Sequence, residues 1–274
     1  MEGTSFIAFF IMDFLFFLVV GVCVGTFGTL IGLGGGLILV PLFMYTMYAP
    51  DGSMTFSTVQ QIIGTSLFAV ACNAVSGAYA YMKQKRIMFR AAIPFALSTI
   101  PGAFCGSFVS KYFTGASFSI AFGCLLVVLG CFMYWKSNSK RATARPEDFD
   151  PATAPFNLWL GVILTFGVGF ISTIFGIGGG IIDVPMMVFI LGFPAQIATA
   201  SSTFILMVSS LVGTISHASL NHIIWVPAIC IGCGCVIGAQ IGARIAKKSK
   251  PRLLVIILSV TMVLMGINLV VRGL

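Results

Sequence analysis

The sequence predicts an all-α polytopic membrane protein made of two inverted repeats of four to five helical segments, each with a Gly-rich broken or re-entrant helical hairpin. Three observations lead to this prediction. Hydrophobic residues make up 58% of the chain and charged residues only 8%, whereas charged residues are about 25% of an average soluble domain. A glycine-rich decapeptide occurs twice, and the basic residues gather in short segments between apolar runs.

Long stretches of the chain contain no Asp, Glu, Lys or Arg. A helix that spans a membrane needs roughly 20 apolar residues, and each charge-free stretch is about that long or longer. Soluble chains rarely lack charge over such lengths, so the composition excludes a soluble globular protein. The charge-free stretches are 14–50, 52–82, 91–110, 112–135, 151–182, 184–243 and 253–271.

The apolar segments follow the same order in both halves of the chain. In the first half they lie at about 13–31, 37–48, 56–82, 91–110 and 117–135. In the second half they lie at about 156–175, 181–191, 195–220, 223–246 and 253–271.

A polar stretch separates the two halves. It carries charges of both signs and several prolines, a composition typical of a loop. We therefore expect a first membrane repeat over 1–135, a cytoplasmic linker over 136–155 and a second membrane repeat over 156–274.

The repeated decapeptide runs from Gly32 to Pro41 and returns from Gly176 to Pro185. Its two copies read GLGGGLILVP and GIGGGIIDVP, with seven of ten positions identical. Glycines that interrupt an apolar helix expose backbone N–H and C=O groups, for which a bilayer offers no water. Such backbone is tolerated where protein covers it or where it lines a polar cavity. Two broken helices at corresponding places in two halves indicate the binding site of a secondary transporter.

The placement of Lys and Arg predicts how the halves are oriented, because these residues stay on the cytoplasmic side. In the first half, the loop after the third segment is basic and the next loop holds only Lys111; in the second half this bias is reversed. Equivalent loops therefore lie on opposite faces, which makes the repeats inverted and places both termini outside. The basic loops contain Lys83, Lys85, Arg86 and Arg90, and Arg244, Lys247, Lys248, Lys250 and Arg252.

Small residues four positions apart recur at corresponding places in the fourth segment of each half. Gly102 and Gly106 match Gly234 and Gly238. This spacing lets membrane helices approach closely, so we interpret these glycines as packing positions. A larger side chain at Gly102 is expected to be absorbed in part by local shifts.

The doubled glycine motif that ends in Val-Pro, together with Gly-Thr-Ser-Leu at Gly64–Leu67, resembles the TauE/SafE family of sulfite and organosulfonate exporters. The resemblance implies an integral membrane protein of the bacterial cytoplasmic (inner) membrane. It also implies export of a small sulfur-containing anion such as sulfite, sulfoacetate or a related organosulfonate. The second half departs from the first at Ala200 and at Asp183, which stands where the first copy has Leu39. The two half-sites therefore need not be equivalent.

The residues themselves also favour an anion site. A helix N-terminus presents free N–H groups and about half a positive charge, and no Lys or Arg lies inside an apolar segment. Helix dipoles and hydroxyl donors must then hold the anion. The alternatives are a structural kink for the glycines and a bond back to its own helix for each hydroxyl. The candidate substrate-binding residues are Gly34, Gly35, Gly36, Gly178, Gly179, Gly180, Thr65, Ser66, Ser201, Ser202 and Thr203.

Asp183 is the only acid well inside an apolar segment. An intramembrane carboxylate indicates function, so Asp183 is a candidate for proton coupling. The alternative is an acid at a helix start that bonds to free N–H groups. His217 and His222 flank a predicted outer loop, where we expect solvated or interfacial positions.

No catalytic residue, metal site or cofactor is expected, because the motifs of zinc proteases, nucleophile elbows and Walker loops are missing. The eight cysteines are expected to pack as small apolar residues. The expected partners are a small anionic substrate and the lipid bilayer, with no nucleic acid, and a homo-oligomer is left open. Three function classes remain: a secondary anion transporter, a passive anion channel of the same fold, and a non-transporting membrane scaffold in sulfur metabolism.

Overall fold

The computed structural model describes residues 2–47, 55–112, 115–136 and 156–273. These residues are helical, with short turns and no strand, and eight helices are long and apolar enough to cross a membrane. The long helices are α1 (Glu2–Ile31), α3 (Val59–Lys83), α4 (Phe89–Val109), α5 (Gly115–Lys136), α7 (Leu158–Phe175), α9 (Ala195–Ser219), α10 (Trp225–Lys248) and α11 (Pro251–Gly273). The shorter elements are α2 (Gly36–Thr46), η1 (Ser110–Tyr112), α8 (Gly180–Pro185) and the π-helical turn η3 (Met186–Ile190).

The expected order of apolar segments is confirmed. The first apolar segment, expected at about 13–31, coincides with the membrane span Phe14–Ile31, although helix α1 itself already begins at Glu2. Two helix starts have side-chain caps: Thr58 and Gln61 form a capping box at α3, and the Asn157 side chain accepts from the N–H of Leu160 at α7. Most of the expected linker lies outside the described residues.

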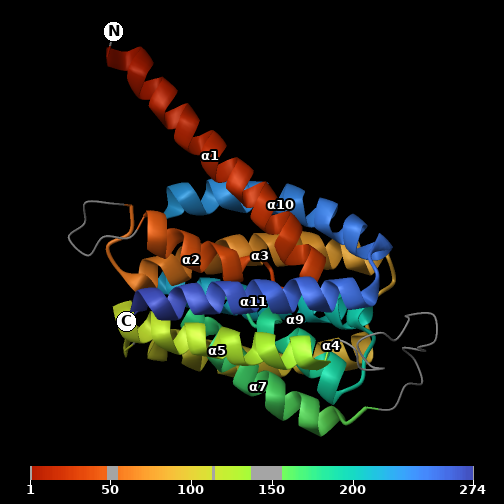
Figure 1. Cartoon of the computed structure of the whole chain (residues 1–274). Helices are drawn as coiled ribbons and strands as arrows, with labels where there is room; N and C mark the ends of the chain where they lie inside the picture. The colour runs from red at the N-terminus through yellow and green to blue at the C-terminus, as the bar shows by residue number, and fades with distance from the viewer. Residues whose placement is uncertain (1, 48–54, 113–114, 137–155, 274) are drawn as a thin grey trace.

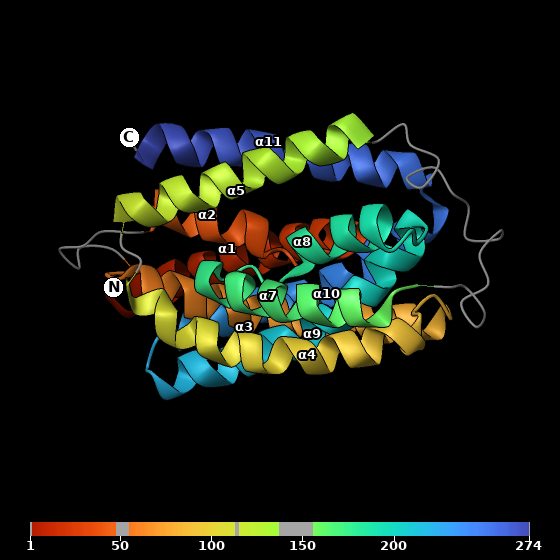
Figure 2. The same cartoon turned by 90° about the horizontal axis from the view of Figure 1, so that it is seen from below.

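Helices α3 and α9 form the middle of the bundle and are the two most buried spans. They pack against each other; α10 also packs on α3, and α4 on α9. Helix α1 lies on α10, and α7 lies on α4. Helices α5 and α11 pair along one face (Figure 2). When the first five segments are exchanged for the last five, the pair α1–α10 becomes α7–α4 and the pair α3–α10 becomes α9–α4, while the pairs α3–α9 and α5–α11 map onto themselves.

The glycines of α4 and α10 are packing positions, as expected. A side chain at Gly102 or Gly106 would overlap the carbonyl oxygen of Phe166 or Phe170 on α7. The expectation that Gly102 tolerates a larger residue is therefore wrong, because rigid backbone rather than a flexible side chain occupies the space.

Most of the described basic residues belong to one end of the bundle. The connections α3–α4 and α10–α11 lie at the right-hand end in Figures 1 and 2, as do the end of α5 and the start of α7. The start of α1 and the end of α11, whose last turn contains Arg272, lie at the left-hand end. This grouping agrees with the charge pattern of a membrane protein whose basic end faces the cytoplasm.

We expect single cysteines placed at Lys85 and Lys250 to react with an impermeant thiol reagent only from the cytoplasmic side. The eight native cysteines are replaced first. A cysteine at Asn221, in the α9–α10 connection, serves as the control and should react only from the outside. Reaction of positions 85 and 250 from opposite sides of the membrane would contradict this orientation.

Candidate functional site

The two glycine motifs form two turns of the same shape. Positive φ angles occur at the same three positions of each turn, which only glycine adopts without strain. Each turn then folds the chain back along its own helix: Gly35 lies against Gly28 and Val24 of α1, and Gly179 lies beside Val168 of α7. The positive-φ positions are Gly32, Gly34 and Gly35, and Gly176, Gly178 and Gly179.

The structure brings these two turns into contact. A Cβ atom on Gly36 would lie 2.8 Å from the Cα of Ile177 and 2.9 Å from the carbonyl oxygen of Gly176. A Cβ atom on Gly180 would overlap the carbonyl oxygen of Gly32. The residues that open α2 and α8 must therefore be glycines, because each start faces the backbone of the other turn.

Two serines hold the turns across the two halves. The Ser66 hydroxyl of α3 donates to the carbonyl of Gly176 at 3.0 Å, and the Ser202 hydroxyl of α9 donates to the carbonyl of Gly32 at 3.3 Å. Each also bonds to its own helix. Each central helix thus fixes the turn of the opposite half.

The other three hydroxyls serve different contacts. Thr65 Oγ1 accepts from the N–H of Ile224 at 3.1 Å, and Ser201 Oγ accepts from the N–H of Met88 at 3.0 Å. Within the described residues neither hydroxyl donates a hydrogen bond, so each keeps a free donor. Thr203 bonds back to its own helix, which is the alternative considered for such residues.

The starts of α2 and α8 carry no side-chain cap. Their N-cap residues are Gly35 and Gly179, and no side chain accepts from the first N–H groups. The first N–H groups of a helix have no intrahelical partner, so both turns offer donors to a ligand. Val70 of α3 and Leu206 of α9 lie against both turns and cover them with apolar surface. Sequence reasoning missed this pair, whose only signal is its equivalent place in the two halves.

Asp183 is fully buried next to the second turn, and its Oδ2 lies 3.3 Å from the point where a Cβ on Gly179 would stand. Neither carboxyl oxygen has a hydrogen-bond partner among the described residues. The alternative, an acid bonded to helix-start N–H groups, is therefore wrong for this conformation. Burying an unpaired carboxylate is costly, so the side chain is expected to be protonated here.

The expectation of a solvated position is wrong for His217. Its side chain is fully buried, and its Nδ1 lies 3.2 Å from the Nδ1 of the half-buried His222.

The expectation that cysteines pack as small apolar residues agrees with the structure for Cys230 and Cys235, which are buried in α10. No group of three potential metal-ligating residues occurs among the described residues.

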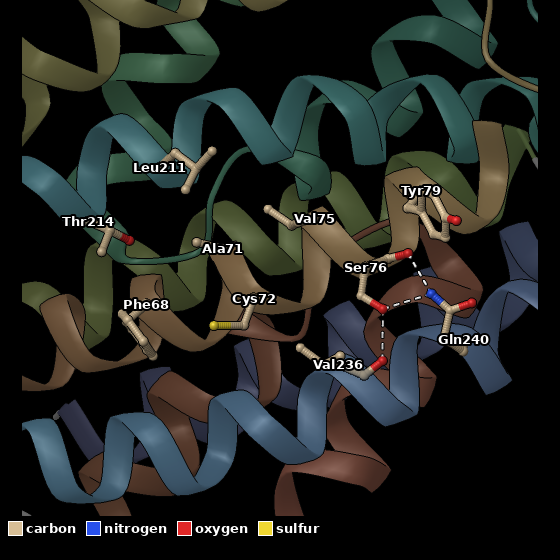
Figure 3. A pocket seen from close by; sticks show the side chains of 10 residues that line it. All are labelled: Phe68, Ala71, Cys72, Val75, Ser76, Tyr79, Leu211, Thr214, Val236 and Gln240. Atoms are coloured by element: carbon tan, nitrogen blue, oxygen red, sulfur yellow. Dashed lines mark hydrogen bonds between the residues drawn. The ribbon is translucent and has the colours of Figure 1, made fainter. Parts of the chain in front are cut away.

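A groove lies away from the turns, between α3, α9 and α10 (Figure 3). It encloses about 600 Å³ and is mostly apolar. The polar groups at one end of the groove bond to one another: Gln240 Nε2 donates to the Ser76 hydroxyl, which donates to the carbonyl of Val236. No free cationic group lines it, so it does not suit a small anion. Its lining residues are Phe68, Ala71, Cys72, Val75, Ser76, Tyr79, Leu211, Thr214, Val236 and Gln240.

Comparisons with known proteins show that the chain is similar to membrane transporters. Residues 17–269 match the family described as "Sulfite exporter TauE/SafE". The chain is 32% identical over 271 residues to "Probable membrane transporter protein YunE" of Bacillus subtilis, covering 96% of this chain and 99% of that protein. It is 28% identical over 263 residues to "Probable membrane transporter protein MJ0441" of Methanocaldococcus jannaschii, covering 91% and 92%. No solved structure matches.

Proposed function

Because the chain belongs to the sulfite exporter TauE/SafE family of membrane transporters, we propose that it is a secondary transporter that exports a small sulfur-containing anion. The substrate class is sulfite, sulfoacetate or a related organosulfonate. The two halves are inverted repeats, and each glycine turn forms the tip of a re-entrant hairpin. The exchange of helix pairs between the halves supports this architecture.

One observation carries the proposal: two uncapped helix starts converge where the glycine turns touch. An oxyanion between them receives N–H groups from both helices and the positive ends of both dipoles. The free donors of Thr65 and Ser201 lie in the helices that hold the turns. In the described conformation Val70 and Leu206 cover the turns, so the binding site opens only when the halves move.

Asp183 couples the anion to a proton in this proposal. A protonated Asp183 places no negative charge beside Gly179, whereas an ionised one repels an anion at short range. Anion and proton therefore bind together more favourably than either binds alone. The first half has no acid at the equivalent position, where Leu39 stands. In this proposal only the second hairpin therefore carries the proton.

The test is a flux panel in proteoliposomes. Radiolabelled sulfite, sulfoacetate, taurine and sulfate are measured with and without a pH gradient. Saturable flux of sulfite or a sulfonate that responds to the gradient supports the proposal. Anion flux that does not change with the pH gradient, whether or not it saturates, favours a passive channel. If the folded protein transports none of the anions, a scaffold is favoured.

Asp183→Asn is expected to remove the response of flux to the pH gradient while the protein still folds into the membrane. The amide keeps the shape of the carboxyl group but cannot exchange a proton. Gradient-driven accumulation should fall to the equilibrium level. Leu39→Asn is the matched control, since it places the same amide at the equivalent buried position. An Asp183→Asn variant that still accumulates anion against its gradient would show that the residue is structural.

A further inference from the structure

Two polar pairs occupy corresponding places at opposite ends of the bundle. Tyr81 and Arg86 lie at the α3–α4 connection, and His217 and His222 lie at the α9–α10 connection (Figure 1). The N–H of Arg86 donates to the carbonyl of Tyr81 at 3.2 Å, and the N–H of His222 donates to that of His217 at 2.9 Å. The residue before each second member has the same positive φ of 56°. The local backbone is therefore the same at both ends.

Each of these connections is also fastened to the other half beside a glycine turn. The α3–α4 connection bonds through Met88 to Ser201, whose neighbour Ser202 holds the first turn. The α9–α10 connection bonds through Ile224 to Thr65, whose neighbour Ser66 holds the second turn. Each connection is thus linked to a glycine turn through two neighbouring residues of a central helix.

The cytoplasmic pair connects a cationic side chain, Arg86, with the first glycine turn. The Tyr81 hydroxyl donates at 2.7 Å to the carbonyl of Thr29, which also accepts from the N–H of Gly32. The Arg86 guanidinium lies 5.8 Å from the centroid of the Tyr81 ring. Its Nη1 contacts Gln84 at 3.4 Å, and its buried Nη2 has no partner among the described residues. A guanidinium with an unfilled donor is a binding group for oxyanions.

The outer pair has no permanent charge. The two Nδ1 atoms at 3.2 Å share one hydrogen bond, in which one ring donates and the other accepts. The Nε2 of His217 is buried and has no partner among the described residues. Burial lowers the pKa of His222, so this ring is neutral at pH 7. The titratable group that faces His217 is His222; α7 faces His217 with the main chain of Thr173, and α3 faces His222 with Gly64.

We propose that these pairs are the two mouths of one anion pathway, with Arg86 as the cytoplasmic capture residue and the His217–His222 pair as an outer mouth that gains charge only in acid. The inference rests on the proposed anion transport. The anion is held more tightly on entry from the cytoplasm than on entry from outside at neutral pH. This difference in affinity between the two mouths favours release of the anion to the exterior. Acidification of the exterior reduces the difference, because a protonated His217–His222 pair attracts the anion.

The test measures the KM for sulfite separately on each face, in inside-out and right-side-out vesicles. Arg86→Gln should raise the cytoplasmic KM by about tenfold, the effect of losing a charge-assisted hydrogen bond of about 1.4 kcal/mol, and leave the maximal rate nearly unchanged. Arg86→Lys should recover part of the loss. Lys85→Asn is the matched control, because it removes the neighbouring exposed charge and copies Asn221 of the other connection. An unchanged KM in Arg86→Gln would overturn the inner assignment.

The outer mouth is tested by making it a copy of the inner one. The double variant His217→Tyr/His222→Arg should lower the external KM at pH 7.5 by about tenfold and abolish its dependence on external pH. In the wild type the external KM should fall between pH 7.5 and 5.5, and in His222→Gln it should stay constant. A His222→Gln variant with the wild-type pH response overturns the outer assignment. Absence of any wild-type flux would instead refute anion transport itself, so the two failures are distinguishable.

Discussion

Gly180→Ala is expected to abolish anion binding and flux. Gly180 has no positive φ, so alanine adds no backbone strain at this position. The added Cβ overlaps the carbonyl oxygen of Gly32 and lies 2.9 Å from the Cα of Leu33. Both neighbours are backbone and cannot swing aside, so the two turns must separate. Overpacking of this kind costs about 1–3 kcal/mol in a well-packed interior, and here it acts directly on the proposed anion site.

Gly36→Ala is the reciprocal change, since its Cβ would lie 2.8 Å from the Cα of Ile177. Gly35→Val and Gly179→Val should also abolish binding, but they add strain at φ angles of +90° and +93°. The alanine variants therefore isolate the effect of space at the contact between the turns.

Gly167→Ala is the control for these variants. It lies on α7, in the same hairpin as Gly180, and a Cβ there meets nothing within 4 Å. Gly102 is unsuitable, because a side chain there overlaps the carbonyl of Phe166. Binding of sulfite is measured on monodisperse protein in detergent. Wild-type affinity in a monodisperse Gly180→Ala variant would move the site away from the turns, to Thr65–Ser66 and Ser201–Thr203.

The features that the sequence predicts well are those with long or repeated signals. Charge-free stretches predict the spans, and the doubled decapeptide predicts two glycine turns, which the structure places in contact. The family resemblance is confirmed by a match over residues 17–269. These signals are strong because a bilayer tolerates few alternatives to an apolar helix.

The roles of single polar side chains could not be predicted in the same way. Ser66 and Ser202 hold turn carbonyls while Thr65 and Ser201 hold loops, yet all four look alike in the sequence. The direction of a hydroxyl depends on helix rotation by a fraction of a turn, and composition does not report this rotation. The correspondence of Tyr81 with His217 was missed for another reason. The repeat extends beyond the glycine motifs at the offset that relates these two positions, but Tyr81 and His217 differ chemically, so nothing in their side chains indicates a shared role.

Asn73→Ala is expected to cause the largest loss of stability among single polar substitutions. The structure places Asn73 fully buried, where Oδ1 accepts from the Thr29 hydroxyl at 2.8 Å. Its Nδ2 donates to the carbonyls of Gly25 and Cys235, at 2.9 and 3.3 Å. One amide thereby joins α3 to both α1 and α10.

The expected loss of stability follows from the number of interhelical hydrogen bonds that Asn73 makes. An interhelical hydrogen bond in a membrane contributes about 0.6 kcal/mol on average, so the loss of three lowers the free energy of unfolding by about 2 kcal/mol. Thermal unfolding in detergent measures the change, and anion binding to the remaining folded protein should keep its wild-type affinity. Ser209→Ala is the control at the equivalent position, where one hydroxyl donates to the carbonyl of Gly178 and where only a smaller loss is expected. If Asn73→Ala unfolds at the wild-type temperature but binds anion more weakly, Asn73 lines the substrate path instead of joining the helices.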